Sequence, residues 1–315
     1  MLYIWNMGGL GNQMFIYAFA RAYQLRYGEP ITFMQHKKRT GAHDECRLHE
    51  LSVAKEGVAF ADAKDAHGYR RSPSRVTFWI FRAIMHVIAK INPLLPYAAE
   101  RVVQGLMNAL GVCRVTGSYY APVRRPLFGL PLVALGYFQS EAYFKPYQTQ
   151  IRRELRVAAQ PLPKNQALLN DIAKTDSVCL HVRRGDYTSP LNAMLLVCTE
   201  TYYRLAVEKM LSLRPNAHFF VFSDDISWAM QSIPLPAGRG VYVNNGNTAT
   251  QEIQLMYHCR HFILSNSSFS WWAQYLGNDD EKIVIAPNLW YSDKRKVDIW
   301  QSQWILVDVN YEVVS

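Results

Sequence analysis

The chain has 315 residues, of which 50% are apolar and 19% are charged. These proportions exclude a disordered chain and provide enough apolar material for two folded domains. The formal net charge of +9 favours anionic partners, namely nucleotide diphosphates, nucleic acid or an acidic membrane surface, and does not choose among them.

The N-terminal residues predict a strand, a glycine-rich turn and a helix in succession. Leu2–Trp5 has the pattern of a strand with no signal peptide before it, Gln13–Tyr27 that of a helix and Ile31–Met34 that of a second strand. Glycines within residues 7–15 let the backbone approach a phosphate or sugar, although their spacing matches neither the dinucleotide fingerprint nor a Walker loop. A tight turn capped by Asn12 is the structural alternative.

The stretch from residue 36 to residue 135 is less regular and helical in its middle. Its most apolar part, Phe78–Tyr97, is interrupted by basic side chains and broken by two prolines, so it is too polar and too short to span a bilayer. One interpretation is a core helix of the first domain. The other is a basic amphipathic face that rests on the inner leaflet of a membrane.

Short apolar runs alternate with helical patterns in the second half of the chain, which favours βα units and a mostly parallel sheet. The expected strands are Val178–Val182, Phe219–Ser223, Gly240–Val243, His261–Ser265, Lys282–Ala286 and Trp304–Val307. The expected helices are Thr201–Leu213, Ile226–Ser232, Thr248–Cys259 and Ser268–Leu276. Pro161 and Pro163 indicate a domain boundary near residue 160, and Pro122–Pro131 is a competing boundary.

The exit of the strand Val178–Val182 carries the strongest chemical signal. Arg183 and Arg184 follow it directly, and two guanidinium groups suit a diphosphate far better than a neutral ligand. Gly185 permits a sharp turn, after which Asp186 can hold one guanidinium so that the other points outward. The alternative interpretation is a surface Arg-Asp pair after an ordinary strand.

The next strand ends in a hydroxyl and two carboxylates, Ser223, Asp224 and Asp225. The two aspartates are adjacent, unlike the metal-binding Asp-x-Asp found in many sugar transferases, so a metal site is not the favoured interpretation. We expect Ser223 or Asp224 to cap the following helix, a role compatible with a polar contact to substrate.

Two helix starts further along the chain carry polar side chains. Thr248 with Gln251 fits a capping box, which places Glu252 in the first turn, where its carboxylate can pair with guanine or complement the helix dipole. Serines and an asparagine crowd residues 265–268, and such a helix start makes a second anion cradle. The tryptophans that follow, at 271 and 272, are expected to pack the helix onto the sheet.

Taken together, these motifs resemble the α-1,2-fucosyltransferases of glycosyltransferase family 11. The matching blocks are Gly8–Phe15, Gly136–Glu141, His181–Tyr187, Phe222–Asp225, Ser265–Trp272 and Ile285–Pro287. The element His-x-Arg-Arg-x-Asp is also similar to that of α-1,6- and protein O-fucosyltransferases, so it alone would indicate only the broader group.

The resemblance implies an α/β fold of the GT-B type, with two Rossmann-like domains facing a cleft. Residues 1–160 would form the acceptor-side domain and residues 161–315 the domain that binds GDP-fucose. The reaction implied is inverting transfer of L-fucose from GDP-β-L-fucose to the 2-hydroxyl of a terminal galactose, with no metal ion and no other cofactor.

By position, the resemblance assigns Arg183 to the β-phosphate with Arg184 and Asp186 in support. His181 and Glu252 would lie near guanine. The remaining substrate contacts implied are Ser223, Asp225, Ser267 and Ser268, with Gly9 and Asn12 lining the cleft from the opposite domain. Asp186 and Glu200 are the candidates for the base that deprotonates the acceptor.

The expected partners are GDP-fucose and a galactose-terminated glycan, such as an O-antigen unit, and no nucleic acid. A GDP-fucose transferase of another linkage or acceptor is the first alternative, and a non-catalytic binder of anionic polymers is the second. Five cysteines without zinc-ligand spacing favour buried thiols and a reducing, cytoplasmic location. Peripheral contact with the inner membrane surface is the alternative interpretation of Phe78–Tyr97.

Overall fold

The computed structural model describes residues 1–35, 45–91, 95–115, 117–278, 280–293 and 295–309. Its contacts divide the chain into two compact units, Met1–Leu155 with Lys296–Ile299, and Arg156–Arg295 with Trp300–Ser315. The chain therefore passes into the second unit at residue 156. Residues Lys296–Ile299 return to the first unit, so a single division near residue 160 does not describe both units fully.

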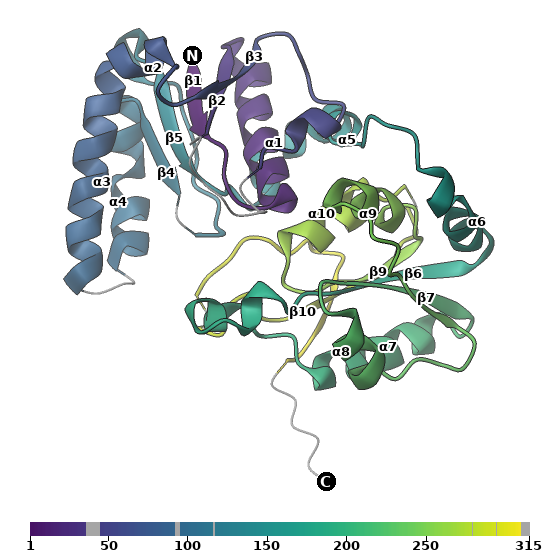
Figure 1. Cartoon of the computed structure of the whole chain (residues 1–315). Coiled ribbons are helices and arrows are strands. Elements are labelled where there is room, and N and C mark those ends of the chain that lie inside the picture. Colours follow the sequence, from purple (N-terminus) through teal and green to yellow (C-terminus); the bar gives the residue numbers. More distant parts are fainter. Residues whose placement is uncertain (36–44, 92–94, 116, 279, 294, 310–315) are drawn as a thin grey trace. The chain divides into compact units, whose positions relative to one another are not determined.

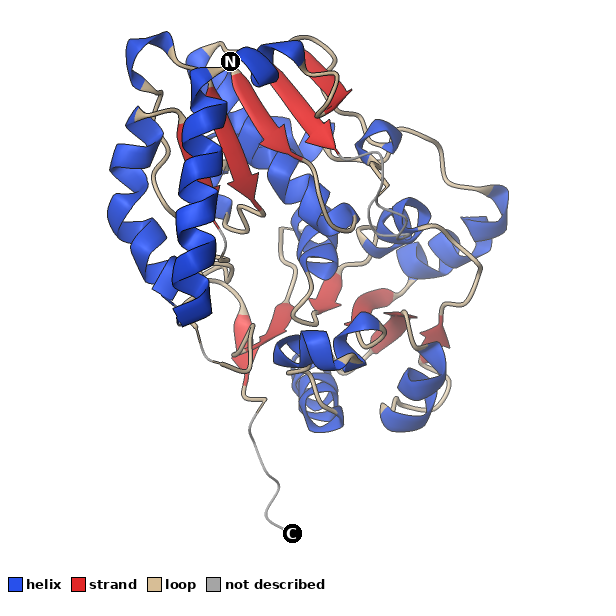
Figure 2. Ribbon diagram, turned by 60° about the vertical axis from the view of Figure 1, so that its left-hand side comes forward, coloured by secondary structure: helices blue, strands red, loops and turns tan. Residues whose placement is uncertain are grey.

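The first unit is built on a five-stranded parallel sheet in the order β3-β2-β1-β5-β4. Its strands are β1 (Leu2–Trp5), β2 (Ile31–Gln35), β3 (Val58–Asp62), β4 (Val112–Val115) and β5 (Leu132–Gly136). Its helices are α1 (Leu10–Tyr27), α2 (His67–Arg71), α3 (Pro73–Ile91), α4 (Leu95–Ala109) and α5 (Gln148–Glu154). One face of the sheet carries α1, and the other carries α3 and α4 side by side (Figure 1, Figure 2).

Side-chain alternation along β1 explains how both faces are covered. Tyr3 and Trp5 are buried in a cluster with Phe78, Phe81 and Met85 of α3. Burial of each such large apolar side chain stabilises the fold by about 1.5–3 kcal/mol. The interpretation of Phe78–Tyr97 as a core helix is thus confirmed for one face of α3, which ends at Ile91.

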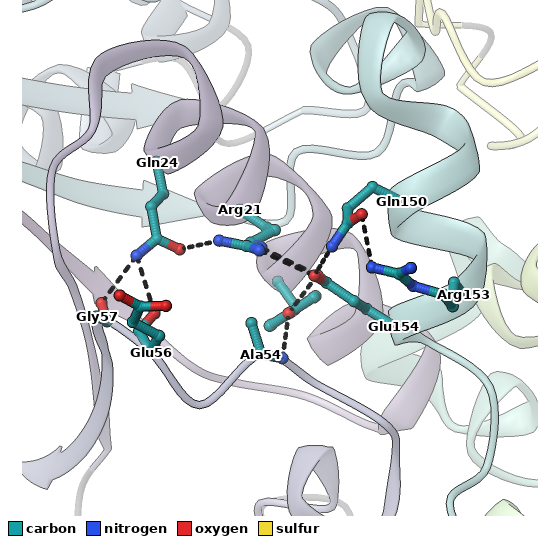
Figure 3. A network of polar contacts seen from close by, with 9 residues as sticks. Arg21, Gln24, Ala54, Glu56, Gly57, Gln150, Arg153 and Glu154 are labelled. Carbon is teal, nitrogen blue, oxygen red and sulfur yellow. Dashed lines mark hydrogen bonds and ion pairs between the residues drawn. The ribbon is translucent and has the colours of Figure 1, made fainter.

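A buried polar network fastens the last helix of this unit to α1 (Figure 3). The Tyr17 hydroxyl donates to the Glu154 carboxylate at 2.6 Å and accepts from the backbone N–H of Ala54 at 2.9 Å. Arg21 donates to the same carboxylate from Nε and Nη2 at 3.0–3.1 Å. Burial raises the pKa of Tyr17, so the hydroxyl stays protonated and able to donate. The network holds α5 in place directly before the chain enters the second unit.

The second unit is built on a six-stranded parallel sheet in the order β11-β10-β9-β6-β7-β8. Its strands are β6 (Asp176–Val182), β7 (Ala217–Ser223), β8 (Gly240–Tyr242), β9 (His261–Ile263), β10 (Val284–Pro287) and β11 (Ile305–Val307). Its helices are α6 (Gln166–Lys174), α7 (Glu200–Leu213), α8 (Ile226–Ser232), α9 (Ala249–Met256) and α10 (Ser268–Leu276). The six expected strands and four expected helices of this half are confirmed, with small differences at their ends.

The strand order creates a switch point between β6 and β9. From β6 the chain moves outward to β7 and β8, then crosses back to β9 on the other side of β6. In open α/β sheets, ligands bind at the carboxyl ends of the strands at such a point. The apolar face of β6, with Val178, Leu180 and Val182, is buried with α7. His181 and Arg183 alternate with these residues, and α9 and α10 lie on the other side of the sheet from α7 and α8 (Figure 1).

All five cysteines are free thiols, four of them buried. Cys259 lies beyond the end of α9, not within it as expected, because the helix stops at Met256. Among the described residues, no helix is both long enough and apolar enough to cross a bilayer.

Candidate active site

Three adjacent strands of the second sheet bring their polar exits to one edge. Val182 of β6 is in register with Ser223 of β7, so Arg183 and Asp224 follow neighbouring strand ends. On the other side of β6, β9 ends at Ile263, two residues before Ser265. Because all three strands are parallel, basic, acidic and hydroxyl side chains gather at the switch point.

Two carboxylates hold the Arg183 guanidinium. Its Nη2 lies 2.7 Å from Asp186 Oδ1, and its Nη1 lies 3.1 Å from Asp224 Oδ2. The side chain is still 23% exposed, so the group is fixed in orientation without being sealed from a ligand. A guanidinium carries five N–H donors, so Arg183 can meet an anion while it contacts both carboxylates.

Arg184 turns away from this pair and lies on the side of β7. Its guanidinium carbon lies 4.0 Å from the centre of the Trp228 ring, and its Nε lies 3.7 Å from Asp225 Oδ2. The two arginines therefore diverge. Arg183 occupies the switch point, and Arg184 stacks on the first turn of α8.

Asp224 also shapes the turn after β6, a role that the sequence did not suggest. Its carboxylate accepts from the backbone N–H of Arg184 at 2.8 Å and of Gly185 at 3.0 Å. A Cβ on Gly185 would lie 2.7 Å from Asp224 Oδ2, so glycine is needed for this close approach. This role of Asp224 depends on β6 and β7 being neighbours in the sheet, and the sequence of either strand alone does not show that.

A histidine and a serine bridge the switch point. His181 Nδ1 lies 2.8 Å from the hydroxyl of Ser265, and both residues are buried. Burial lowers the pKa of His181 to about 4, against an opposing effect from Asp224 and with a smaller lowering effect from Arg183, so the imidazole is neutral at physiological pH. Ser265, which was not among the expected substrate contacts, fixes the ring beside Arg183.

Glu252 faces the same cluster from α9. The predicted capping box is confirmed: the Thr248 hydroxyl accepts from Gln251 N–H, and the Gln251 side chain accepts from Thr248 N–H. Burial raises the pKa of Glu252 to about 7, with a further increase from Asp224 and an opposing effect from Arg183. Its carboxyl is therefore poised between its two protonation states at neutral pH.

The turn before α10 presents serines at a helix start. Ser267 is the N-cap and accepts from Phe269 N–H at 3.3 Å, and Ser268 is the first helical residue. Buried Asn266 anchors the turn by donating to the carbonyls of Leu195 and Trp290 at 2.8 and 3.0 Å. The arrangement leaves the start of α10 suited to an anion. Both tryptophans that follow are fully buried, which confirms their expected packing role.

The cap of α8 differs from the expectation. Asp225, and not Ser223 or Asp224, accepts from Trp228 N–H at 3.1 Å as the N-cap. Ser223 instead accepts from Asp225 N–H at 2.9 Å. The prediction was wrong because Asp224 is engaged by the turn after the neighbouring strand.

Glu200, the second candidate base, is the exposed first residue of α7. This helix packs on the face of β6 opposite to His181 and Arg183. Among the residues that the structure describes, no hydrogen bond or ion pair joins Glu200 to the Arg183 cluster. Its position in the first turn complements the helix dipole.

The first unit has its own polar site at the switch between β1 and β5. Gln139, after β5, donates to Asn12 Oδ1 at 2.8 Å and accepts from the Ser118 hydroxyl at 2.6 Å. Gly8 has φ +74°, and a Cβ there would lie 2.7 Å from Asn12 Nδ2. Gly9, not Asn12, is the N-cap of α1, which begins at Leu10. Asn12 does not cap α1 and forms part of this site with Gln139.

The backbone after β5 is strained. Phe138 has φ 52°, a region that bulky residues rarely adopt, yet its side chain is fully buried. Its ring stacks on Phe19 of α1 at a centroid distance of 3.8 Å. This packing holds the strained turn and thereby aims the neighbouring Gln139 at Asn12.

Among the described residues, no group of three or more His, Cys, Asp or Glu side chains is arranged to hold a metal ion.

The sequence profile of glycosyl transferase family 11 matches residues 127–308. Alpha-1,2-colitosyltransferase of Escherichia coli is 29% identical over 311 residues, which covers 96% of this chain and 97% of that protein. Human galactoside alpha-(1,2)-fucosyltransferase 1 is 28% identical over 195 residues, which covers 58% of this chain and 52% of that protein.

Among solved structures, fucosyltransferase NodZ from Bradyrhizobium aligns with a TM-score of 0.50 at 15% identity, over 87% of this chain and 92% of that chain. The fold is therefore α/β of the GT-B type, with two Rossmann-like domains, as expected.

Proposed function

Because this chain belongs to glycosyl transferase family 11 and is a glycosyltransferase, we propose that it transfers L-fucose from GDP-β-L-fucose to the 2-hydroxyl of a terminal galactose. The displacement inverts the anomeric centre and needs no metal ion. The observation that carries the proposal is the Arg183 guanidinium, held by Asp186 and Asp224 at the switch point of the second sheet.

Arg183 supplies the main electrostatic effect. As the bond to fucose breaks, the sugar acquires oxocarbenium character and negative charge grows on the β-phosphate of GDP. A cationic donor fixed before the reaction stabilises that charge without reorganising, which contributes about 3–4 kcal/mol. Backbone N–H groups and serines at the start of α10, Ser267 and Ser268, supply further donors.

The surroundings of the two aspartates support metal independence. Asp224 is engaged by the Arg183 guanidinium and by two backbone N–H groups. Asp225 caps α8 and lies beside Arg184. Both carboxylates thus have cationic or N–H partners in place of a divalent ion, and arginine takes over neutralisation of the diphosphate.

Guanine recognition falls to Glu252, beside neutral His181. An ionised carboxylate accepts two hydrogen bonds from the N1–H and N2–H₂ edge of guanine, which adenine does not offer. Because burial holds the pKa of Glu252 near 7, nucleotide binding must favour its ionised form. Specificity for a guanine nucleotide then follows from one side chain.

We assign Asp186 a positioning role, since its carboxylate lies 2.7 Å from Arg183 Nη2 and is engaged in that ion pair. Glu200, exposed at the start of α7, is the remaining candidate for the base. Glu200→Gln should lower kcat by about 10²-fold if it takes the acceptor proton. Unchanged turnover would remove it from the mechanism.

The donor sugar has one competitor with direct support. A relative over nearly the whole chain carries the name alpha-1,2-colitosyltransferase, and colitose is fucose without its 3-hydroxyl. We favour fucose as donor and an O-antigen unit as acceptor, the latter supported by the relative named O-antigen biosynthesis glycosyltransferase WbnK, of E. coli, 25% identical over 315 residues.

A single set of assays tests the proposal. The protein is mixed with EDTA, with GDP-fucose or GDP-colitose, and with lactose or Gal-β1,3-GalNAc, and the linkage is read by NMR. We expect an α-1,2-fucoside at full rate in EDTA. A product with another linkage, strict preference for GDP-colitose, or loss of activity in EDTA would each overturn the corresponding part.

A further inference from the structure

Helix α3 has two apolar faces, and only one of them is buried. Phe78, Phe81 and Met85 face the first sheet and are at most 7% exposed. The opposite face also carries large apolar side chains, with exposed fractions between 41% and 77%. These are Val76, Trp79, Ile80, Ile84, Val87 and Ile91.

Their spacing makes this outer face continuous. At 100° per residue, Val76, Ile80, Val87 and Ile91 fall within about 60° of one another, on the side of the helix away from the sheet. Such an arc is the pattern of a helix with a second apolar partner. Isolated exposed apolar residues are ordinary on protein surfaces, but a contiguous stripe is not.

The apolar surface extends onto the neighbouring elements. On α4, which packs beside α3, Val102 is 85% and Leu106 63% exposed. Next to α4, Leu127 lines the same pocket as Gly105 and Ala109 of that helix. Phe128, the residue after Leu127, has φ 55° and is 93% exposed. A bulky side chain in strained backbone, presented to water, indicates a contact that the isolated chain does not contain.

The charged side chains of α2 and α3 are all basic. From Ala66 to Ala99 the sequence holds five Lys and Arg residues, two His and no Asp or Glu. Arg82 and Lys90 are exposed on the edge of the apolar face of α3, and the Arg82 guanidinium lies 4.9 Å from the Trp79 ring. Tryptophan and basic side chains beside an apolar helical face are typical of helices that lie in the headgroup region of a bilayer.

From these observations we propose that the outer face of α3 and α4, with Leu127 and Phe128, docks on a membrane rich in anionic lipid. The apolar side chains enter the acyl boundary, and Arg82 and Lys90 meet the phosphates. A second copy of the chain fits this face less well, because the basic edge of α3 would meet its own like charges. The inference concerns only the first unit and does not depend on the donor sugar.

Vesicle binding by the full chain tests the proposal. Vesicles of phosphatidylcholine alone are compared with vesicles containing 30% phosphatidylglycerol, by co-sedimentation at low and high salt. We expect binding to the anionic vesicles that weakens with salt, and Arg82→Gln with Lys90→Gln to reduce the partition coefficient about fivefold per charge. Lys174→Gln with Lys209→Gln, an equal loss of exposed charge in the second unit, should leave binding within about twofold.

The apolar contribution is tested by the triple variant Ile80→Gln, Ile84→Gln and Val87→Gln. We expect at least about a tenfold loss of binding, because three side chains no longer enter the bilayer. Its control replaces exposed apolar residues of the second unit, Leu213→Gln, Met230→Gln and Leu306→Gln. Circular dichroism and the melting temperature establish that each variant folds.

Three outcomes would overturn the proposal. The wild-type chain could fail to bind anionic vesicles, or the folded α3 triple variant could bind as well as its control. Alternatively, sedimentation velocity without lipid could show a wild-type dimer that the α3 variant converts to monomer, which would assign the face to a second copy. None of these readouts requires catalysis, so they stand apart from any failure of the fucosyl-transfer proposal.

Discussion

The Asp224 carboxylate lies 3.1 Å from the Arg183 guanidinium, and it also accepts hydrogen bonds from the backbone N–H groups of Arg184 and Gly185. One side chain therefore fixes both the direction of the cation and the path of the turn after β6. This relationship ties the β6 exit to the β7 exit, and it leads to the first three predictions.

Loss of Arg183 should affect the chemical step far more than folding. We expect Arg183→Ala to lower kcat by about 10²–10³-fold, because the charge growing on the leaving diphosphate loses its fixed donor. Arg183→Lys should recover only part of the rate, since an ammonium cannot contact Asp186, Asp224 and phosphate in one plane. Steady-state kinetics on folded protein measure both, with Arg204→Lys on the exposed face of α7 as the control. Near-normal turnover of Arg183→Ala would contradict the assignment.

Asp224→Asn should reduce activity because the Arg183 guanidinium is no longer held in its orientation. The amide keeps one acceptor oxygen but loses the charge that holds Arg183, so we expect a fall in kcat of about tenfold or more with a smaller change in donor KM. Asp171→Asn, the same change at an exposed position of α6, is the control. If both variants lose activity equally, Asp224 has no special role in placing the guanidinium.

Gly185→Ala tests the close approach directly. The added Cβ would lie 2.7 Å from Asp224 Oδ2, so the turn must shift and Arg183 loses its alignment. We expect destabilisation of about 1–3 kcal/mol together with lost activity. Gly238→Ala is a poor comparison because of its positive φ, whereas Gly105→Ala has open space and ordinary φ, and should leave activity unchanged. An active, stable Gly185→Ala variant would show that the turn tolerates a side chain.

The raised pKa of Glu252 predicts a pH dependence of both binding and stability. With a pKa of about 7, the carboxyl is mostly protonated at pH 6 and mostly ionised at pH 8, so GDP affinity should rise about tenfold over this range. Glu252→Gln removes this rise. Ionisation of the nucleotide phosphate affects wild type and variant equally, so the ratio of their Kd values at each pH isolates the contribution of Glu252. Isothermal titration calorimetry at both pH values provides the measurement. Parallel profiles would exclude Glu252 from guanine binding.

The raised pKa of Glu252 also determines how the stability of the fold changes with pH. The folded-state pKa lies above the ordinary value of 4.5, so the folded chain binds more protons and its stability falls as pH rises from about 4.5 to 7. Glu252→Gln should remove this loss and melt at a higher temperature than wild type at pH 8 in the absence of nucleotide. Differential scanning calorimetry of both proteins at pH 5 and pH 8 checks it, and an equal pH response in the two would contradict the shift.

The network around Glu154 should matter for folding alone. Glu154→Gln leaves Arg21 without its charged partner in a nearly buried position, and we expect about 3 kcal/mol of destabilisation of the first unit. Glu208→Gln, which breaks the exposed pair with Arg204, should cost less than about 0.5 kcal/mol. Thermal unfolding of both variants compares the two, and similar melting temperatures would mean that the Glu154 network is dispensable.

Local patterns predicted the second unit well. Its buried strands are rich in apolar residues, as in Phe219–Phe222, and the capping box at Thr248 marks a helix start without tertiary information. In the first unit, β3 reads Val-Ala-Phe-Ala-Asp at a partly exposed edge of the sheet, and β4 contains a cysteine and an arginine. Neither has a strong strand signal, so the region from residue 36 to residue 135 could not be divided into elements.

The sequence indicated the arginine and serine turns that the structure brings together, but not the contacts that link them. Asp224 and Ser265 act through residues about 40 and 84 positions away. Their roles depend on which strands are neighbours and in what register, and the sequence of one strand does not carry that information. Gln139 was also missed. Its partner Asn12 is distant in the sequence, and the two meet only because β1 and β5 are neighbours in the sheet.

The most direct test of the central claim is a crystal structure of the protein with GDP. We predict the β-phosphate within hydrogen-bonding distance of the Arg183 guanidinium, with Asp186 and Asp224 still in contact with that side chain. A well-ordered nucleotide whose diphosphate is bound elsewhere, with Arg183 paired only to its two carboxylates, would contradict it.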